Sequence, residues 1–232
     1  MGTPYDQETL MAAQACFAQA SRLLYCEPNE SDVAAQAEQR LFAEAPFGMD
    51  HADVREGLAA MDAWCAEPPT AERVAALKRE WFRLFVGAGT PEAPSWESFY
   101  VDPNSQLFSK RTLEVRAWYQ RYGLQIERLH AEPDDHLGLM LGFVSHLIGL
   151  EAAARAEGDE RRADEVAHDQ EAFIVEHVLP WLAAWRYSVD KHAASGYFRG
   201  AAGFVFGLCA CYAQRFGIAF DEGRQAFTRM SG

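Results

Sequence analysis

The sequence predicts an all-α fold, a bundle-like single domain over residues 1–232 with roughly eight to ten helices. Nearly every segment repeats its apolar residues with helical period. No stretch alternates convincingly with period two between hairpin turns. The 232 residues, of which 49% are hydrophobic and 12% aromatic, are enough to bury a substantial core.

The first four helices follow from apolar stripes and capping residues. Residues 6–25 should form a helix that stops at "CEPNE". Ser31 can cap a second helix, and a third is expected over about 50–65. Thr70 then caps a strongly amphipathic helix. Its apolar stripe, by default core packing, consists of Val74, Leu77, Trp81, Leu84 and Phe85.

The longest irregular stretch is "VGAGTPEAPSWESFYVDPNS", residues 86–105, in which glycine, proline and three aromatics are mixed. Loops of this length are functional or disordered, and the aromatics favour an ordered one. Helical pattern resumes over about 109–122. A further helix should begin at Pro133 and run to about 157.

The C-terminal part is also expected to be helical. Residues 151–171 carry eight acidic and three basic side chains, which indicates a solvated helix–turn–helix. A helix should then continue to about 185. The last long helix, crowded by glycines, is expected over about 191–216.

The formal net charge of −13 and the pI near 4.9 argue against nucleic acid and anionic membranes as partners. They favour cationic partners, or serve solubility alone. The five cysteines contain no CxxC pair, which indicates free thiols in a reducing compartment and hence the cytoplasm. The N-terminus does not resemble a secretory signal, and apolar runs such as "AAGFVFGLCACYA" fall short of a membrane span.

The segment "EPDDHL", residues 132–137, precedes a long apolar helix and is open to several interpretations. As a helix start, Pro133 occupies the first helical position, and Asp134 and Asp135 lie in the first turn, where the helix dipole favours carboxylates. His136 is left unexplained. The same residues also suggest an acid–base cluster, a metal site or a docking point for another chain.

Two of these chemistries are poorly supported by spacing. Adjacent residues on a helix point about 100° apart, so Asp135 and His136 do not easily share a metal ion. No serine or cysteine nucleophile with a recognisable elbow accompanies them, and "GAGTPEA" lacks the ending of a phosphate-binding loop. We therefore expect no metal and no cofactor.

Four motifs in order resemble one family, the TorD/DmsD chaperones of molybdenum-cofactor oxidoreductases. They are "EWFRLFVG" at 80–87, "APSWESFY" at 93–100, "LFSKRTLEVRAWYQRYGL" at 107–124, and the Glu-Pro-x-Asp-His signature at 132–136. His177 and Trp181 match the later His-x-x-x-Trp pair of the family. Without the resemblance, that pair is most simply an interior contact.

The resemblance implies a cytoplasmic chaperone without enzymatic activity. It would bind the twin-arginine leader and the apo form of an oxidoreductase of the dimethyl sulfoxide/trimethylamine N-oxide reductase class, and hold it for cofactor insertion before export. Contacts with cofactor-insertion machinery would also be possible, and the chain would be a monomer or a dimer. The leader-binding residues carried over are Trp81, Leu84, Phe85, Trp96, Tyr100, Glu132, Pro133, Asp135, His136, His177 and Trp181.

The chemistry of a twin-arginine leader agrees with this set, because two guanidinium groups need nearby carboxylates and an apolar stretch needs an aromatic groove. His136, with a pKa near 6.5, would make binding pH-sensitive. Replacing Asp135 or His136 by alanine is expected to abolish binding and leave the fold intact. The alternative function is a nucleotide-binding or weakly hydrolysing maturation factor that uses the same acidic cluster. A third is a scaffold that presents the acidic 151–171 segment.

Overall fold

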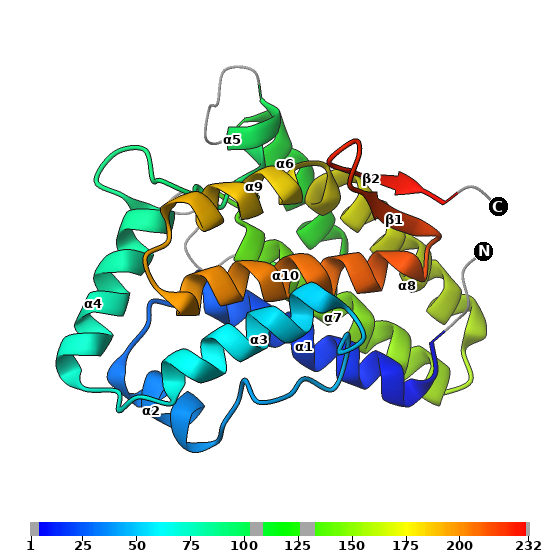
Figure 1. Cartoon of the computed structure of the whole chain (residues 1–232). Coiled ribbons are helices and arrows are strands. Elements are labelled where there is room, and N and C mark those ends of the chain that lie inside the picture. The colour runs from blue at the N-terminus through cyan, green and yellow to red at the C-terminus, as the bar shows by residue number, and fades with distance from the viewer. Residues whose placement is uncertain (1–4, 103–108, 126–132, 231–232) are drawn as a thin grey trace.

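The computed structural model describes residues 5–102, 109–125 and 133–230, and it is a helical assembly with a small C-terminal hairpin (Figure 1). The helices are α1 (Gln7–Tyr25), α2 (Glu30–Glu38), α3 (Ala52–Cys65), α4 (Ala71–Trp81), α5 (Glu97–Val101), α6 (Lys110–Arg121), α7 (Leu137–Ala156), α8 (Glu160–Phe173), α9 (Leu179–His192) and α10 (Gly196–Gln214). Two π-helical turns are η1 (Phe82–Val86) and η2 (Ile174–Val178). The hairpin strands are β1 (Ile218–Asp221) and β2 (Ala226–Arg229). The all-α prediction is therefore confirmed for the main body of the fold.

Of the two capping side chains predicted from the sequence, one is confirmed and one is wrong. The Thr70 side chain accepts a hydrogen bond from the amide of Arg73, as predicted. At α2 the cap is Asn29 rather than Ser31, because the Asn29 side chain accepts from the amide of Asp32 at 2.9 Å. The prediction that Ser31 caps this helix is wrong by two residues.

Two helix pairs bring the chain together. α1 lies along α7, and α3 lies along α10 (Figure 1). Both pairs use glycine to approach closely: a Cβ atom on Gly57 would stand 2.5 Å from the carbonyl oxygen of Gly200, and one on Gly138 would stand 2.9 Å from the Cβ of Tyr25. Side chains at these positions would push the helices apart.

Among the described residues, α7 is the one helix that is long and apolar enough to cross a bilayer by length and composition. The expectation that every apolar run falls short of a membrane span is therefore wrong. Neighbouring helices bury most of α7. Its buried residues include Leu137, Leu141, Val144 and Ile148. It packs against α1 on one side and α8 on another, which is the position of a central core helix.

Several boundaries differ from the predicted ones. The predicted helix over 191–216 is divided, because α9 extends to His192 and α10 begins only after Ser195, whose hydroxyl caps it. The hairpin was not predicted at all: its strands have four residues each, too few for a clear alternation. It is held to α10 by Phe220 and Phe227, whose rings lie 4.9 and 5.6 Å from that of Phe206.

The acidic 151–171 segment does form a helix–turn–helix, the end of α7 followed by α8, but it is less solvated than predicted. Glu151 is fully buried and accepts from Arg215 at 2.9 Å. Asp169 is buried and accepts from the Tyr122 hydroxyl at 2.5 Å. These two carboxylates tie helices together, so the segment presents fewer free charges to a partner than its sequence indicates.

Candidate functional site

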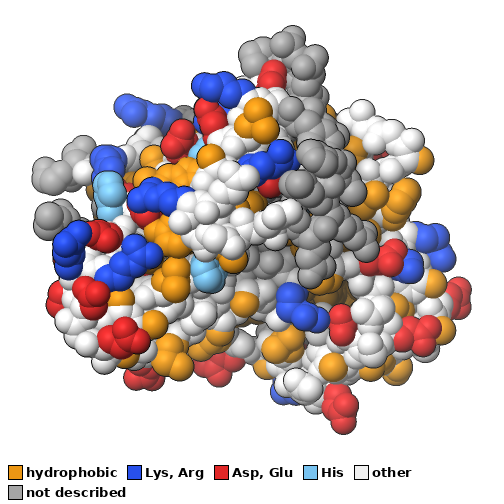
Figure 2. Space-filling view, turned by 180° about the vertical axis from the view of Figure 1, so that it is seen from behind, with side chains coloured by type: hydrophobic (Ala, Val, Ile, Leu, Met, Phe, Trp, Pro, Cys, Tyr) orange, Lys and Arg blue, Asp and Glu red, His pale blue; other side chains and the backbone are white. Residues whose placement is uncertain are grey.

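A groove of about 860 Å³ opens between the end of α1, η1, the end of α6 and α7. We call it the apolar groove. Its apolar and aromatic lining consists of Tyr25, Trp81, Phe82, Val86, Tyr119, Leu124, Leu139 and Phe143. Figure 2 shows the back of the molecule, where hydrophobic side chains are exposed in patches between charged ones. A hollow of this size, lined in this way, is typical of a binding site.

The wall formed by η1 explains why apolar side chains are exposed here. α4 ends in a π-helical turn, and such turns occur often at functional sites. Leu84 and Phe85 point into the core with 0% and 1% exposure, whereas Phe82 and Val86 are 44% and 39% exposed and line the apolar groove. The Trp81 indole is half-buried and donates to the carbonyl oxygen of Leu24 at 3.2 Å, which fixes η1 against α1.

The floor of the groove depends on the close contact of α1 with α7. Gly142 lines the groove, and a Cβ atom there would stand 3.0 Å from the hydroxyl of Ser21. A larger side chain at this position would meet α1 and fill part of the hollow. The glycine therefore keeps both the helix contact and the open floor.

Directly beside the groove lies a buried polar cluster, the Asp134–His136 node. The carboxylate of Asp135 accepts from the amide of Ser98 and from the hydroxyl of Thr112, both at 2.8 Å. The carboxylate of Asp134 accepts from the Arg116 guanidinium at 2.7 Å. The node thereby joins the start of α7 to α5 and α6.

His136 occupies the N-cap position of α7, where its Nδ1 accepts from the amide of Gly138 at 3.1 Å. Its ring packs edge-on against those of Tyr25 and Trp96, with centroid distances of 5.4 and 6.1 Å. Burial lowers the pKa of His136 to about 3. The imidazole is therefore neutral at physiological pH, and the predicted pH-sensitive grip through this residue is wrong.

The predicted helix start at Pro133 is also corrected. α7 begins at Leu137, so Pro133 is not its first residue, and Asp134 and Asp135 are not in its first turn. Both aspartates precede the helix because their carboxylates bind α5 and α6 instead of the α7 amides. Glu132, also predicted for the site, lies outside the described residues.

The other predicted site residues are mostly internal. Tyr100 stacks on Trp181 with ring centroids 5.1 Å apart. The Trp181 indole donates to the carbonyl oxygen of His177 at 2.6 Å, and His177 Nδ1 lies 3.0 Å from the carboxylate of Glu97. Burial raises the pKa of the Glu97 carboxyl, an effect that the neighbouring His177 opposes. The interpretation of His177 and Trp181 as an interior pair is confirmed.

Of the predicted residues, the structure thus places Trp81 in the apolar groove and His136 and Trp96 behind the Tyr25 wall. Sequence reasoning missed Tyr25, Phe82, Val86 and the α6–α7 side of the groove. The available signal was the position of Phe82 and Val86 off the buried stripe of their helix, since apolar residues on an outer helix face indicate a contact surface.

Metal chemistry finds little support in the described part of the chain. Residues 5–102, 109–125 and 133–230 contain no group of three or more His, Cys, Asp or Glu side chains placed to hold a metal ion. The Asp134–His136 node is also inaccessible, because its three side chains are at most 4% exposed.

These features define a class of protein: a helical domain with an open apolar groove next to a buried node whose aspartates accept hydrogen bonds from neighbouring helices. A family model described as nitrate reductase delta subunit matches residues 49–186, and the chain belongs to this family. The TorD/DmsD resemblance inferred from the motifs is confirmed by the relatives found.

The relatives match the chain over different lengths. The Tat proofreading chaperone DmsD of Salmonella typhimurium is 32% identical over 123 residues, which are 53% of each chain. The chaperone protein TorD of Actinobacillus pleuropneumoniae is 26% identical over 169 residues, 72% of this chain and 74% of the relative. The match thus spans about half the length of the first relative. A solved structure assigned as a redox enzyme maturation protein, from Archaeoglobus fulgidus, has 17% identity and a TM-score of 0.48, with 84% of this chain and 92% of the other covered.

Proposed function

We propose that this protein is a chaperone that binds the leader of a twin-arginine-exported molybdenum-cofactor oxidoreductase of the dimethyl sulfoxide/trimethylamine N-oxide reductase class. It would hold the apo form in the cytoplasm until the cofactor is inserted. The observation that carries the proposal is the apolar groove, with Phe82 and Val86 exposed at its wall. The naming of two relatives as a Tat proofreading chaperone and a chaperone protein TorD supports it.

The groove fits the apolar stretch of such a leader better than its arginines. Its lining is mainly aromatic and aliphatic, which suits an apolar helix face laid into a groove. Aromatic side chains in the wall of a groove, such as Trp81 and Phe82, are typical anchors of interfaces. The net charge of −13 attracts the cationic end of the leader over longer distance.

In this proposal the predicted residues have different parts. Trp81 contacts the leader directly. His136 and Trp96 hold the Tyr25 wall, and Leu84 and Phe85 anchor η1 in the core. The proposed action is binding, and it is supported by the burial of Asp134, Asp135 and His136, which are at most 4% exposed.

The first experiment is calorimetric titration of the purified protein with a synthetic leader of the molybdoenzyme encoded beside its gene. The control peptide keeps the two arginines and replaces the apolar stretch by glycine and serine. We expect micromolar or tighter binding of the leader and a loss of at least tenfold with the control peptide. Absence of binding at high micromolar leader would contradict the proposal.

A thermal-shift screen with ATP, GTP and Mg²⁺ separates this proposal from a nucleotide-dependent factor. A ligand present at 100 times its Kd stabilises the fold by about 2.7 kcal/mol. We expect no shift with nucleotide and a clear shift with leader. A shift with nucleotide alone would favour the alternative.

A further inference from the structure

A hollow of about 280 Å³ lies between α6 and the π-helical turn η2, on residues that do not line the apolar groove. We call it the His177 hollow. Its volume corresponds to roughly nine water molecules at about 30 Å³ each, which is room for a small head group and its alkyl stem. The residues that line it are Glu114, Ala117, Trp118 and Arg121 of α6 with Glu176 and His177 of η2.

The imidazole of His177 is buried, with its side chain 1% exposed, yet only one of its two nitrogens is hydrogen-bonded. Nδ1 lies 3.0 Å from the carboxylate of Glu97, and that carboxylate has the Arg111 guanidinium 3.6 Å away. The guanidinium favours an ionised carboxylate, which only accepts, so Nδ1 donates to Glu97 and Nε2 carries the lone pair. Within the described residues Nε2 has no hydrogen-bond partner, although buried polar atoms normally have one.

The unpartnered Nε2 is turned toward the hollow. Because Nδ1 faces Glu97 on α5, Nε2 points away from α5 and toward Glu176, whose carboxylate is 3.9 Å away. That distance is too long for a hydrogen bond, and both residues line the hollow. The carboxylate of Glu114 lines it from the α6 side. The hollow therefore presents three acceptors, which call for a group with several N–H donors.

Cations of the chain do not satisfy these acceptors fully. Glu114 is paired with Lys110 and with Arg111, at 3.0 and 3.2 Å. Glu176 is 53% exposed, and its contact with Arg111 is 3.8 Å, beyond hydrogen-bond distance. In the part of the chain that the structure describes, neither Lys110 nor Arg111 bonds to His177 Nε2.

The remaining cation of the lining, Arg121, is directed elsewhere. It pairs with Asp169 of α8 at 2.9 Å, and its guanidinium lies 5.2 Å from the centroid of the Trp118 ring. The ring of Trp118 thus already has a cation over it. A ligand cation is left with the space at Nε2, between the two rim carboxylates.

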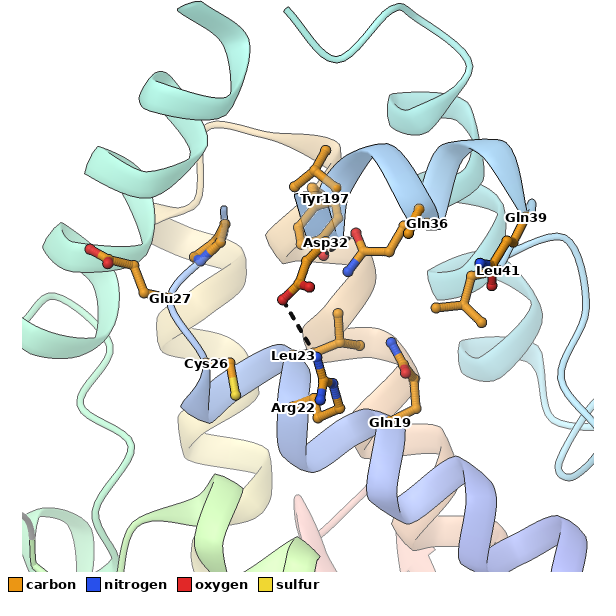
Figure 3. A pocket seen from close by; sticks show the side chains of 13 residues that line it. Gln19, Arg22, Leu23, Cys26, Glu27, Asp32, Gln36, Gln39, Leu41 and Tyr197 are labelled. Atoms are coloured by element: carbon orange, nitrogen blue, oxygen red, sulfur yellow. Dashed lines mark hydrogen bonds and ion pairs between the residues drawn. The ribbon is translucent and has the colours of Figure 1, made fainter. Parts of the chain in front are cut away.

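The hollow between α1 and α2 provides the contrast (Figure 3). There Arg22 pairs with Asp32 at 3.4 Å, and Glu27 pairs with Lys78 at 3.0 Å. Its lining, as far as the structure describes it, includes no buried side-chain atom that lacks a hydrogen-bond partner. Carboxylates are present at both hollows, but the His177 hollow also has a buried acceptor without a donor.

We propose that the His177 hollow binds a primary ammonium group at the end of an alkyl stem, as in a lysine side chain or a polyamine. An ammonium group has three N–H donors, one for Nε2 and two for the carboxylates of Glu176 and Glu114. One nitrogen can reach both Nε2 and Glu176, because these acceptors are 3.9 Å apart. The inference does not rest on the leader, since the hollow shares no lining residue with the apolar groove.

The binding test observes Nε2 directly, by long-range proton–nitrogen NMR of protein labelled with nitrogen-15 histidine. Signals are assigned by replacing the other histidines one at a time. The probes, at constant ionic strength, are butylammonium and tetramethylammonium, which carries the same charge without N–H donors. We expect butylammonium to shift the Nε2 signal of His177 saturably, with a Kd on the order of a few millimolar, and tetramethylammonium to leave it unchanged.

The role of the rim charge is tested with Glu176→Gln, which should weaken butylammonium about three- to fivefold because it removes one exposed ion pair. The matched control is Glu165→Gln on α8, the same substitution at a 48% exposed side chain outside the hollow, which should leave the Kd unchanged. Absence of a saturable shift, or an equal shift with tetramethylammonium, would overturn the site. Equal weakening by both variants would show a general field effect and would overturn it as well.

Two further probes, spermidine and Nα-acetyl-lysine methylamide, separate the sources of the ammonium group. Spermidine has a second ammonium group that can contact the exposed rim carboxylate of Glu176. Binding of spermidine about tenfold tighter than the lysine derivative would identify a free polyamine as the ligand. Equal or weaker binding would identify a lysine side chain of a protein partner. Failure of the leader titration would leave these results unaffected, because it concerns the other face of α6.

Discussion

The apolar groove and the Asp134–His136 node are neighbours that satisfy their side chains in opposite ways. In the node, buried carboxylates accept from an amide, a hydroxyl and a guanidinium of the chain. In the groove, Phe82 and Val86 are exposed to solvent although they are apolar. The comparison separates two tasks: the node determines how the helices are joined, and the groove offers surface to another molecule.

Two tyrosines connect these regions. Tyr25 lines the groove and packs edge-on against His136. Tyr119 also lines the groove, and its hydroxyl donates to the backbone carbonyl of Asp134 at 2.9 Å. A change in the node should therefore reach the groove through its walls, whereas a change on the groove surface should leave the node intact.

The largest effect that this comparison predicts is on stability, from Asp135→Ala. The substitution removes the acceptors of Ser98 N and Thr112 Oγ1 in a fully buried site. Hydrogen bonds to a buried charged group contribute about 1.5–3 kcal/mol each, so we expect a loss of about 3 kcal/mol. For a domain of this size that lowers Tm by about 6–12 °C, measured by circular dichroism.

Asp135→Asn is the matched control, since its amide oxygen can still accept one of the two bonds and the loss should be smaller. The earlier expectation that Asp135→Ala removes leader binding and spares the fold assumed a surface carboxylate. If the alanine variant unfolds within 1 °C of wild type, the node does not join the helices as described.

A second prediction concerns acid stability. The pKa of His136 is about 3 in the folded state because of burial, against about 6.5 for an exposed histidine. Between these values the unfolded state binds more protons, so stability falls as pH drops below 6.5, by up to about 1.4 kcal/mol per unit. Above pH 6.5 this dependence of stability on pH is absent, because the imidazole is neutral in both the folded and the unfolded state.

His136→Asn tests this, because asparagine can still cap α7 and does not titrate. The variant should have a lower free energy of unfolding than wild type at pH 7.5. At pH 5 this difference should be smaller by about 2 kcal/mol, because only wild type loses stability as the pH falls. Urea unfolding at both values measures it. The control is His168→Asn on α8, which makes the same substitution at an exposed histidine outside the node. If the difference in free energy of unfolding between wild type and His136→Asn is the same at both pH values, His136 is not held neutral by burial.

The same two regions show what could be predicted from sequence. Helix positions such as 71–81 were predictable, because an apolar stripe and a Thr70 cap are local signals. The role of Asp135 was not, because its partners Ser98 and Thr112 are 37 and 23 residues away in the sequence. A Pro-Asp-Asp run before a helix looks like a dipole-favoured first turn until those partners are known.

The groove was only partly predictable for a related reason. Trp81 was identified through the family motif, but its neighbours in the groove come from α1, α6 and α7. The apolar stripe of the helix predicts core positions for Leu84 and Phe85, and their exposures of 0% and 1% confirm it. Their assignment to the leader-binding surface came from the family resemblance and not from this local pattern.

A third prediction sharpens the comparison on the groove side. Phe82→Ser removes a 44% exposed ring from the groove wall and should weaken leader binding about tenfold, or about 1.4 kcal/mol. Its effect on the free energy of unfolding should stay within about 0.5 kcal/mol. Tyr187→Ser on α9, where the ring is 69% exposed and outside the groove, is the matched control. Equal binding by the two variants would place the leader elsewhere.

The smallest expected effect changes neither stability nor affinity and reports only on access. Burial raises the pKa of Cys16 and of Cys65 to about 11, and it also raises those of Cys209 and Cys211. Because the thiolate is the nucleophile, these four cysteines should react slowly with a maleimide. Cys26 is exposed at the edge of the groove and should react first, with one label per chain by mass spectrometry.

Saturating leader should slow the labelling of Cys26 several-fold and leave the other four cysteines unchanged. Asp135→Ala, measured without leader, should do the reverse, since loosening of the node exposes buried thiols while Cys26 is already open. The two regions are thereby distinguished in one assay: a ligand acts on the groove cysteine, and a packing defect acts on the core cysteines. Protection of Cys26 by the glycine–serine control peptide would show that access is blocked by charge alone and not by occupation of the apolar groove.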